Sequence, residues 1–253
     1  MAEQKQEFKF PSETIELPSG GKCYPKDSIL SSGKIELKYM TAKEEDILTS
    51  QNLIKKGVVI DTLLNSLIIT EGVKSSDLLI GDKNAVMVAA RILAYGGEYK
   101  VEVTNPTTGE TFPHKFDLTQ CEFTELSKDV DYSTNEFELE LPVTKIKITF
   151  KLLTGADEEN ITKELNSLKK IGQHAEVTTR LRHLITSVNG ETDKSIISNF
   201  VDNMLSKESL FLRDEVQRIN PDIDLTQDVE IEGDTVSLEI PMTVEFFWPK
   251  AGA

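Results

Sequence analysis

Histidine side chains are the first candidates for acid–base catalysis in this sequence. The three histidines, His114, His174 and His183, stand far apart, and none lies next to a recognisable nucleophile in the sequence. His183 follows Arg180 and Arg182 on a predicted helix, where an imidazole can act as a general base but where most histidines face solvent. The histidines therefore predict no catalytic site.

Cysteines and clustered carboxylates are the candidates for metal binding. Cys23, His114 and Cys121 are zinc-ligand types, but the chain contains no Cys-x-x-Cys pair, which many structural zinc sites use. Acidic runs at 44–46 and 157–159 lack the alternating oxygen spacing of a calcium loop. Carboxylates are favoured in the first turn of a helix, so both runs indicate helix starts. We expect no metal and no cofactor.

A phosphate-binding loop is suggested by Ser19-Gly20-Gly21-Lys22, which ends in Gly-Lys. Such a loop needs a glycine five residues before its Gly-Lys pair and a Ser or Thr after it. Here Glu16 and Cys23 occupy those positions. The pattern predicts a turn between strands.

The chain of 253 residues is strongly acidic, with 43 Asp and Glu residues against 28 Lys and Arg residues and a net charge of −15. This surface repels phosphate backbones and anionic lipid headgroups, so we expect neither nucleic acid nor membrane as a partner. No apolar run approaches the roughly 18 residues of a membrane span, and residues 1–10 contain no signal-peptide core. We expect a protein that folds in a reducing cytoplasm.

Helices and strands alternate in blocks along the chain. Thr41 and Glu44 form a capping-box pattern. Apolar spacing predicts helices over 41–56, 58–69, 82–95, 157–171, 175–188, 194–204 and 206–219. Alternation of apolar and polar residues predicts strands over 34–40, 98–104, 112–118, 137–141, 146–152 and 236–246.

These blocks predict an α+β fold that combines helical segments with antiparallel hairpins. Its four segments are an amino-terminal strand region with helices (1–96), a β region (97–153), a helical region (154–221) and a carboxy-terminal hairpin with an aromatic end (222–253).

The aromatic cluster Phe246-Phe247-Trp248-Pro249 near the end of the chain is unusual for an acidic protein. Two interpretations stay open. Phe246 and Trp248 close the core of the last β element, or the cluster anchors a partner, because exposed aromatic side chains are frequent interface hot spots.

Four stretches together resemble the T-even-type phage baseplate hub proteins, a family that includes hub subunits and hub assembly factors. They are 17–25 (LPSGGKCYP), 39–48 (YMTAKEEDIL), 53–57 (LIKKG) and 246–249 (FFWP). Their order and spacing over most of the chain carry the resemblance.

Zinc-knuckle-like hairpins of the form Cys-Pro-x-Cys-Gly are frequent in that family. In this chain Asn105 and Thr108 stand where cysteines would be, beside Pro106 and Gly109, and a second hairpin at 230–234 also lacks cysteine. The resemblance therefore implies degenerate zinc-knuckle-like hairpins without metal, in which strand packing replaces the contribution of the metal.

The function that the resemblance implies is that of a non-enzymatic structural or assembly protein of a contractile phage tail, which works through protein surfaces in the baseplate hub. Its partners are then other baseplate hub proteins and the tape-measure protein. It is expected in the bacterial host cytoplasm during assembly and then in the virion tail baseplate. The candidate contact residues are Leu17, Tyr24, Phe247 and Trp248.

Two alternatives stay open beside this function. The first is a tail assembly chaperone that holds the tape-measure protein and is absent from the mature particle. The second, from another class, is a hydrolase that uses carboxylates brought together by the fold.

Overall fold

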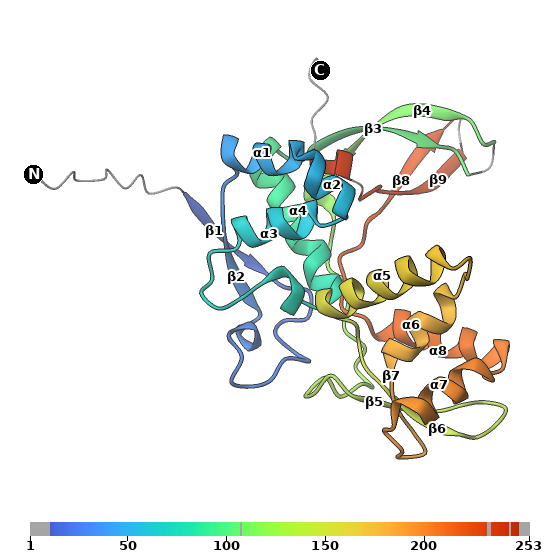
Figure 1. Cartoon of the computed structure of the whole chain (residues 1–253). Coiled ribbons are helices and arrows are strands. Elements are labelled where there is room, and N and C mark those ends of the chain that lie inside the picture. The colour runs from blue at the N-terminus through green and yellow to red at the C-terminus, as the bar shows by residue number, and fades with distance from the viewer. Residues whose placement is uncertain (1–10, 107, 232–233, 243, 248–253) are drawn as a thin grey trace, which may run out of the picture.

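In the described part of the chain, four small antiparallel sheets lie among helices (Figure 1). The computed structural model describes residues 11–106, 108–231, 234–242 and 244–247. The mixed α+β class predicted from the sequence is confirmed. The helices separate into an amino-terminal group and a group formed by residues 155–219.

The first sheet pairs β1 (Ser12–Glu16) with β2 (Lys34–Lys38). A long loop, residues 17–33, joins the two strands, so the Gly20-Gly21 turn lies inside this loop and does not close a tight hairpin. Gly21 has φ +81°, and a Cβ atom there would lie 2.3 Å from the carbonyl oxygen of Ser31. The loop therefore packs on itself closely enough to require glycine.

The helix predicted over 41–56 consists of two helices, α1 (Ala42–Thr49) and α2 (Gln51–Lys56). Ser50 between them is extended, with φ −68° and ψ 101°. Serine competes with helical hydrogen bonding and favours helix ends, which accounts for the break. Helices α3 (Val59–Leu67) and α4 (Ile80–Tyr95) follow the predicted pattern.

Two hairpins lie side by side at one end of the molecule (Figure 1). They are β3–β4 (Glu98–Thr104 and Thr111–Asp117) and β8–β9 (Thr226–Ile231 and Asp234–Glu239). Gln227 donates from Nε2 to the carbonyl oxygen of Asp117 at 2.6 Å and so links them. The strand predicted over 236–246 ends at Glu239, because Pro241 cannot donate to a sheet, and residues 244–247 form a 3-10 helix.

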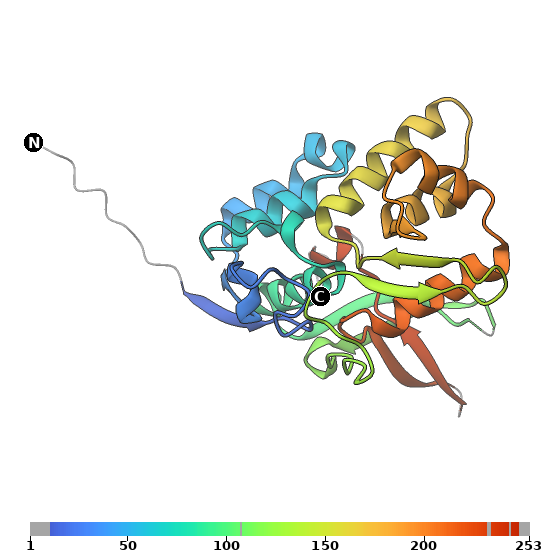
Figure 2. The same cartoon turned by 90° about the horizontal axis from the view of Figure 1, so that it is seen from below.

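The remaining sheet has the order β5-β6-β7. Strands β5 (Phe137–Glu140) and β6 (Lys147–Phe150) form the predicted hairpin, and β7 (Ile185–Val188) pairs with β6. The predicted helix over 175–188 is wrong in its last four residues, since β-branched residues there find a strand partner in β6. Helices α5 (Gly155–Lys170), α6 (Glu176–Leu184), α7 (Lys194–Asp202) and α8 (Ser206–Ile219) surround this sheet (Figure 2).

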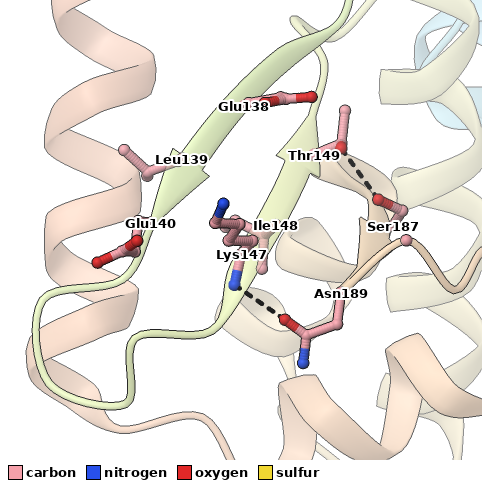
Figure 3. Close-up of a pocket in the computed structure, with 9 residues that line it drawn as sticks. Glu138, Leu139, Glu140, Lys147, Ile148, Thr149, Ser187 and Asn189 are labelled. Atoms are coloured by element: carbon pink, nitrogen blue, oxygen red, sulfur yellow. Dashed lines mark hydrogen bonds between the residues drawn. The ribbon is translucent and has the colours of Figure 1, made fainter.

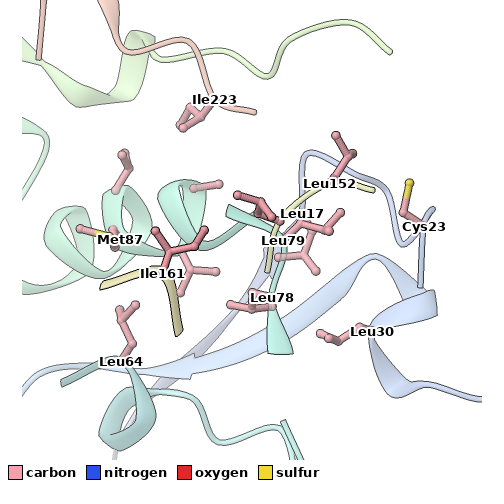
Figure 4. Close-up of a cluster of buried hydrophobic side chains, with 14 of the residues drawn as sticks. Leu17, Cys23, Leu30, Leu64, Leu78, Leu79, Met87, Leu152, Ile161 and Ile223 are labelled. Carbon is pink, nitrogen blue, oxygen red and sulfur yellow. The ribbon is translucent and has the colours of Figure 1, made fainter. Parts of the chain in front are cut away.

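Buried apolar side chains from all four segments belong to one hydrophobic cluster. Figure 4 shows its centre, where Leu17, Leu79, Leu152, Ile161 and Ile223 come together from separate parts of the chain. Their burial drives the packing of the segments on one another.

Candidate functional site

The loop of residues 17–33 is fastened to α4 by a buried carboxylate. Asp82 accepts hydrogen bonds from the Ser19 backbone (2.9 Å), the Ser19 hydroxyl (2.7 Å) and the Tyr24 hydroxyl (2.6 Å). The Tyr24 oxygen accepts in turn from the backbone of Leu79 at 2.8 Å. Burial raises the pKa of Asp82, and the hydrogen bonds offset this only in part. The carboxylate therefore orders the loop.

Leu17 and Tyr24, two of the candidate contact residues, lie in this buried region. Their exposed fractions are 2% and 7%. Leu17 points into the hydrophobic cluster of Figure 4, and the hydroxyl of Tyr24 is occupied by Asp82. Both side chains therefore stabilise the isolated chain and present almost no surface to a partner.

Cys23, between them, has a positive φ of 67°. Burial, with the nearby Asp82 charge, raises the pKa of its thiol to about 12. The thiol is therefore protonated at neutral pH and lacks the thiolate character of a nucleophile or metal ligand.

The aromatic end is also packed inside. Phe246 and Phe247 are fully buried, and the Phe246 ring meets the Tyr99 ring edge to face with 5.0 Å between ring centres. Phe246 therefore closes the core, as the first interpretation states. Phe247, a candidate contact residue, is equally buried, and Trp248 lies outside the described residues.

A buried arginine holds this end in place. Arg91 of α4 donates from Nε to the carbonyl oxygen of Phe246 at 2.9 Å. Its other nitrogens reach the carbonyl oxygens of Gly96 (3.2 Å) and Glu98 (3.3 Å), and its guanidinium stacks on Tyr95 with 4.9 Å to the ring centre. Burial lowers the pKa of Arg91. Arg91 is not among the residues predicted from the sequence, although a charge inside the apolar run of 85–95 is a signal.

Glu208 is another buried carboxyl group that the sequence did not reveal, because a glutamate in a first helical turn is ordinary. Its Oε1 accepts from the backbone of Val143 (3.2 Å) and from the backbone (2.7 Å) and hydroxyl (2.8 Å) of Thr144. Its Oε2 is buried and has no hydrogen-bond partner in the described part of the chain. Glu208 therefore holds the β5–β6 turn against α8.

The β3–β4 turn is closed by Asn105, which stands where the resemblance places a cysteine. Its carbonyl oxygen accepts from the backbone of Gly109 at 2.8 Å, and its side chain accepts from the backbone of Thr108 at 3.3 Å. Among the residues that the structure describes, no group of three or more His, Cys, Asp or Glu side chains is placed to hold a metal ion.

A polar pocket of about 770 Å³ lies among α5, α6, β7 and α7. Asp157 there contacts Lys151 at 2.7 Å. Burial raises the pKa of Asp157, but the hydrogen bonds from Lys151 and Thr154 outweigh it and lower the pKa overall. An ionised carboxylate cannot serve as a general acid.

Glu164, the other carboxylate in this pocket, contacts Arg182 at 3.4 Å and His183 at 3.3 Å. No serine, threonine or cysteine is hydrogen-bonded to His183 in the described residues. In the hydrolase alternative Asp157 would therefore act only as a general base or nucleophile, and the general acid would have to be another group of the pocket.

A second pocket, of about 630 Å³, lies along strands β5, β6 and β7 (Figure 3). Glu138 and Glu140 line it from β5. On β6, Thr149 lies opposite Glu138 and Lys147 lies opposite Glu140. The hydroxyl of Ser187 on β7 donates to Thr149 at 2.9 Å. The pocket is thus polar, with two exposed carboxylates on one side.

Large apolar side chains at the surface concentrate in one part of the molecule. Of the twelve that are exposed among the described residues, seven belong to the β5–β6 turn and the helices of residues 155–219. They are Val143, Ile171, Val177, Ile196, Leu205, Leu210 and Phe211.

The buried polar groups and these exposed apolar side chains belong to a protein of mixed α+β class. The profile of the family described as T4 bacteriophage base plate protein matches residues 10–248. The chain therefore belongs to this family, and it is a structural protein of the phage baseplate.

No curated protein and no solved structure matches the chain. In the part that the structure describes, every helix is too short or too polar to cross a membrane.

Proposed function

We propose that the chain is a structural or assembly subunit of the baseplate hub of a contractile phage tail and that it acts through protein–protein contacts. Family membership supports a role in the baseplate. The proposal assigns the contacts to residues 137–219, a region called here the helical lobe.

The observation that carries this assignment is the concentration of exposed apolar side chains on the helical lobe. Full burial of such a side chain is worth about 1.5–3 kcal/mol, so a partner that covers several of them gains substantial affinity. Leu205, Leu210 and Phe211 lie at the start of α8, where Glu208 also holds the turn that carries Val143. The start of α8 and the β5–β6 turn thus both present apolar side chains near the buried Glu208.

The partners that we propose are other baseplate hub proteins and the tape-measure protein. The acidic surface argues against nucleic acid and anionic membrane as partners. The chain then meets its partners in the bacterial host cytoplasm during assembly and stays in the virion tail baseplate.

Quantitative mass spectrometry of purified phage particles tests the proposal. If the chain is a subunit, purified particles should contain it in stoichiometric amounts, and it should cross-link to hub proteins. A chain that assembly requires but that purified particles lack contradicts the subunit role and supports the tail assembly chaperone. Retention of normal hub assembly after deletion of the chain contradicts both.

Matched variants locate the contact surface. The double variant Leu210→Ser/Phe211→Ser should reduce incorporation at least about tenfold, because exposed anchors dominate binding. The control is Ile29→Ser in the loop of residues 17–33, since Ile29 is similarly exposed. Equal incorporation of the two variants contradicts a contact through α8.

Trp248 stays a candidate contact residue of this proposal. The change Trp248→Ala should weaken partner binding more than it lowers the melting temperature. A large loss of melting temperature at unchanged partner affinity would assign Trp248 to the core.

A further inference from the structure

The connection between α5 and α6 leaves two apolar side chains uncovered. On α5, Ile161 is buried, Leu165 is partly buried and Ile171 at the end is 69% exposed. On α6, Leu181 is buried, but Val177 one turn earlier is 48% exposed. Val177 and Leu181 lie on the same face because they are one helical turn apart, and Ile171 directly follows α5, so both exposed side chains lie at the connection of the two helices.

This connection, residues 166–177, is called the α5–α6 tip. It carries Lys169 and Lys170 and a single carboxylate, Glu176, in a chain with 43 acidic and 28 basic residues. Both lysines are exposed, and neither takes part in an ion pair within the described residues. Basic residues suit the end of a helix, but the helix end does not account for the uncovered Ile171.

The pocket along β5, β6 and β7 has the opposite character. Glu138 and Glu140 line it on the sheet face that also carries Lys147, its single basic lining residue, whereas the side chains of Leu139 and Ile148 alternate to the core-facing side (Figure 3). Glu138 forms no ion pair within the described residues, and the contact of Glu140 with Lys145 is long, at 3.8 Å. The carboxylates are therefore available to a cation from outside.

We infer that the α5–α6 tip of one copy docks into the pocket along β5, β6 and β7 of a second copy. Lys169 and Lys170 then face Glu138 and Glu140, and Ile171 is covered at the pocket. Figures 1 and 2 both show the tip apart from strands β5 and β6, so one chain cannot fill its own pocket.

The contact joins two different surfaces, so it is heterologous and propagates head to tail. Copies joined in this way form a closed ring or an open filament, depending on the rotation between them. The inference deepens the proposed function, because it names a second copy of the chain as one partner in the hub.

Sedimentation velocity of the purified full-length chain tests the contact. The wild-type chain should form larger species as its concentration rises. The variants Lys169→Glu/Lys170→Glu and Glu138→Lys/Glu140→Lys should each raise the association Kd at least about tenfold, since like charges then face each other. Circular dichroism checks that each variant is folded.

An equimolar mixture of the two charge-reversed variants is the decisive sample. The acidic tip of one variant then meets the basic pocket of the other, and association should return. The control is Lys55→Glu/Lys56→Glu, which reverses a matching exposed lysine pair at the end of α2 and should leave association unchanged.

Three results would overturn the inference: a wild-type chain that stays monomeric up to about 100 μM, association that survives either reversal, or a mixture that fails to restore it. A monomeric chain that is nevertheless present in purified particles leaves the proposed function standing, so the two failures are distinguishable.

Discussion

The hydroxyl of Tyr24 lies 2.6 Å from Oδ2 of Asp82, a residue 58 positions further along the chain, and donates a hydrogen bond to it. The same oxygen of Tyr24 accepts from the backbone of Leu79. One side chain thus connects the loop of residues 17–33 to the start of α4 twice. Residues 17–25, which the family resemblance singled out, are in this structure an anchor of the fold.

Removal of this hydroxyl should destabilise the protein. The change Tyr24→Phe leaves the Leu79 amide without its acceptor and Asp82 with one donor fewer, and an unmet buried polar group costs about 1–3 kcal/mol. Urea unfolding measures the loss. The control Tyr39→Phe removes an exposed hydroxyl contact with Glu13 and should cost less than about 0.5 kcal/mol. Equal losses would contradict the anchor role.

Glu44 should make stability depend on pH in the acid range. Burial raises its pKa, but hydrogen bonds from Lys38, Thr41 and Ser66 outweigh burial and lower the pKa to about 2 from a usual 4.5. Because the pKa of Glu44 is lower in the folded than in the unfolded protein, its ionised carboxylate stabilises the fold at pH values above about 4.5. This contribution is lost as pH falls from about 4.5 toward 2.

The change Glu44→Gln measures this contribution directly. It should cost about 2–3 kcal/mol at pH 7, and the difference from the wild type should shrink as pH falls below about 4.5. Chemical denaturation at a series of pH values records both curves. A constant difference between pH 7 and pH 3 would show that packing, and not the charge, accounts for the loss.

Arg91 should control the order of the carboxy-terminal segment. The change Arg91→Met keeps apolar volume but removes the donors to the carbonyl oxygens of Phe246, Gly96 and Glu98. Hydrogen exchange should rise at residues 244–247 before it rises elsewhere. The control Arg218→Met removes exposed ion pairs and should leave exchange there unchanged. Unchanged exchange in Arg91→Met would contradict the clamp.

Glu208 should control the β5–β6 turn. The change Glu208→Ala leaves the amides of Val143 and Thr144 without their acceptor, so stability should fall by about 1–3 kcal/mol. Hydrogen exchange should rise at residues 141–146. The control Glu215→Ala removes an exposed ion pair of the same helix and should change neither quantity appreciably. Protection of the turn in Glu208→Ala would contradict its role as an anchor.

Elements whose cause is local follow from the amino-acid sequence alone. The capping box is confirmed by the hydrogen bond from the Thr41 backbone to Glu44 at 2.9 Å, and the hairpin β5–β6 by the register that sets Leu139 against Ile148. The end of the helix predicted over 41–56 is confirmed by Gly57, which follows Lys56 with a φ of +71°. Such signals depend on neighbours within a few residues, so spacing and turn chemistry suffice to predict them.

Long-range packing sets which face of each helix or strand contacts another element. Residues 185–188 form a strand only because β6 is available as a partner, with Thr149 opposite Ser187. Leu17, Tyr24 and Phe247 were candidate contact residues in the sequence, and the fold buries them against groups far along the chain. Ile171 stays exposed, because the cluster of buried apolar side chains does not extend to the end of α5. Burial depends on long-range packing, and no local pattern contains that information.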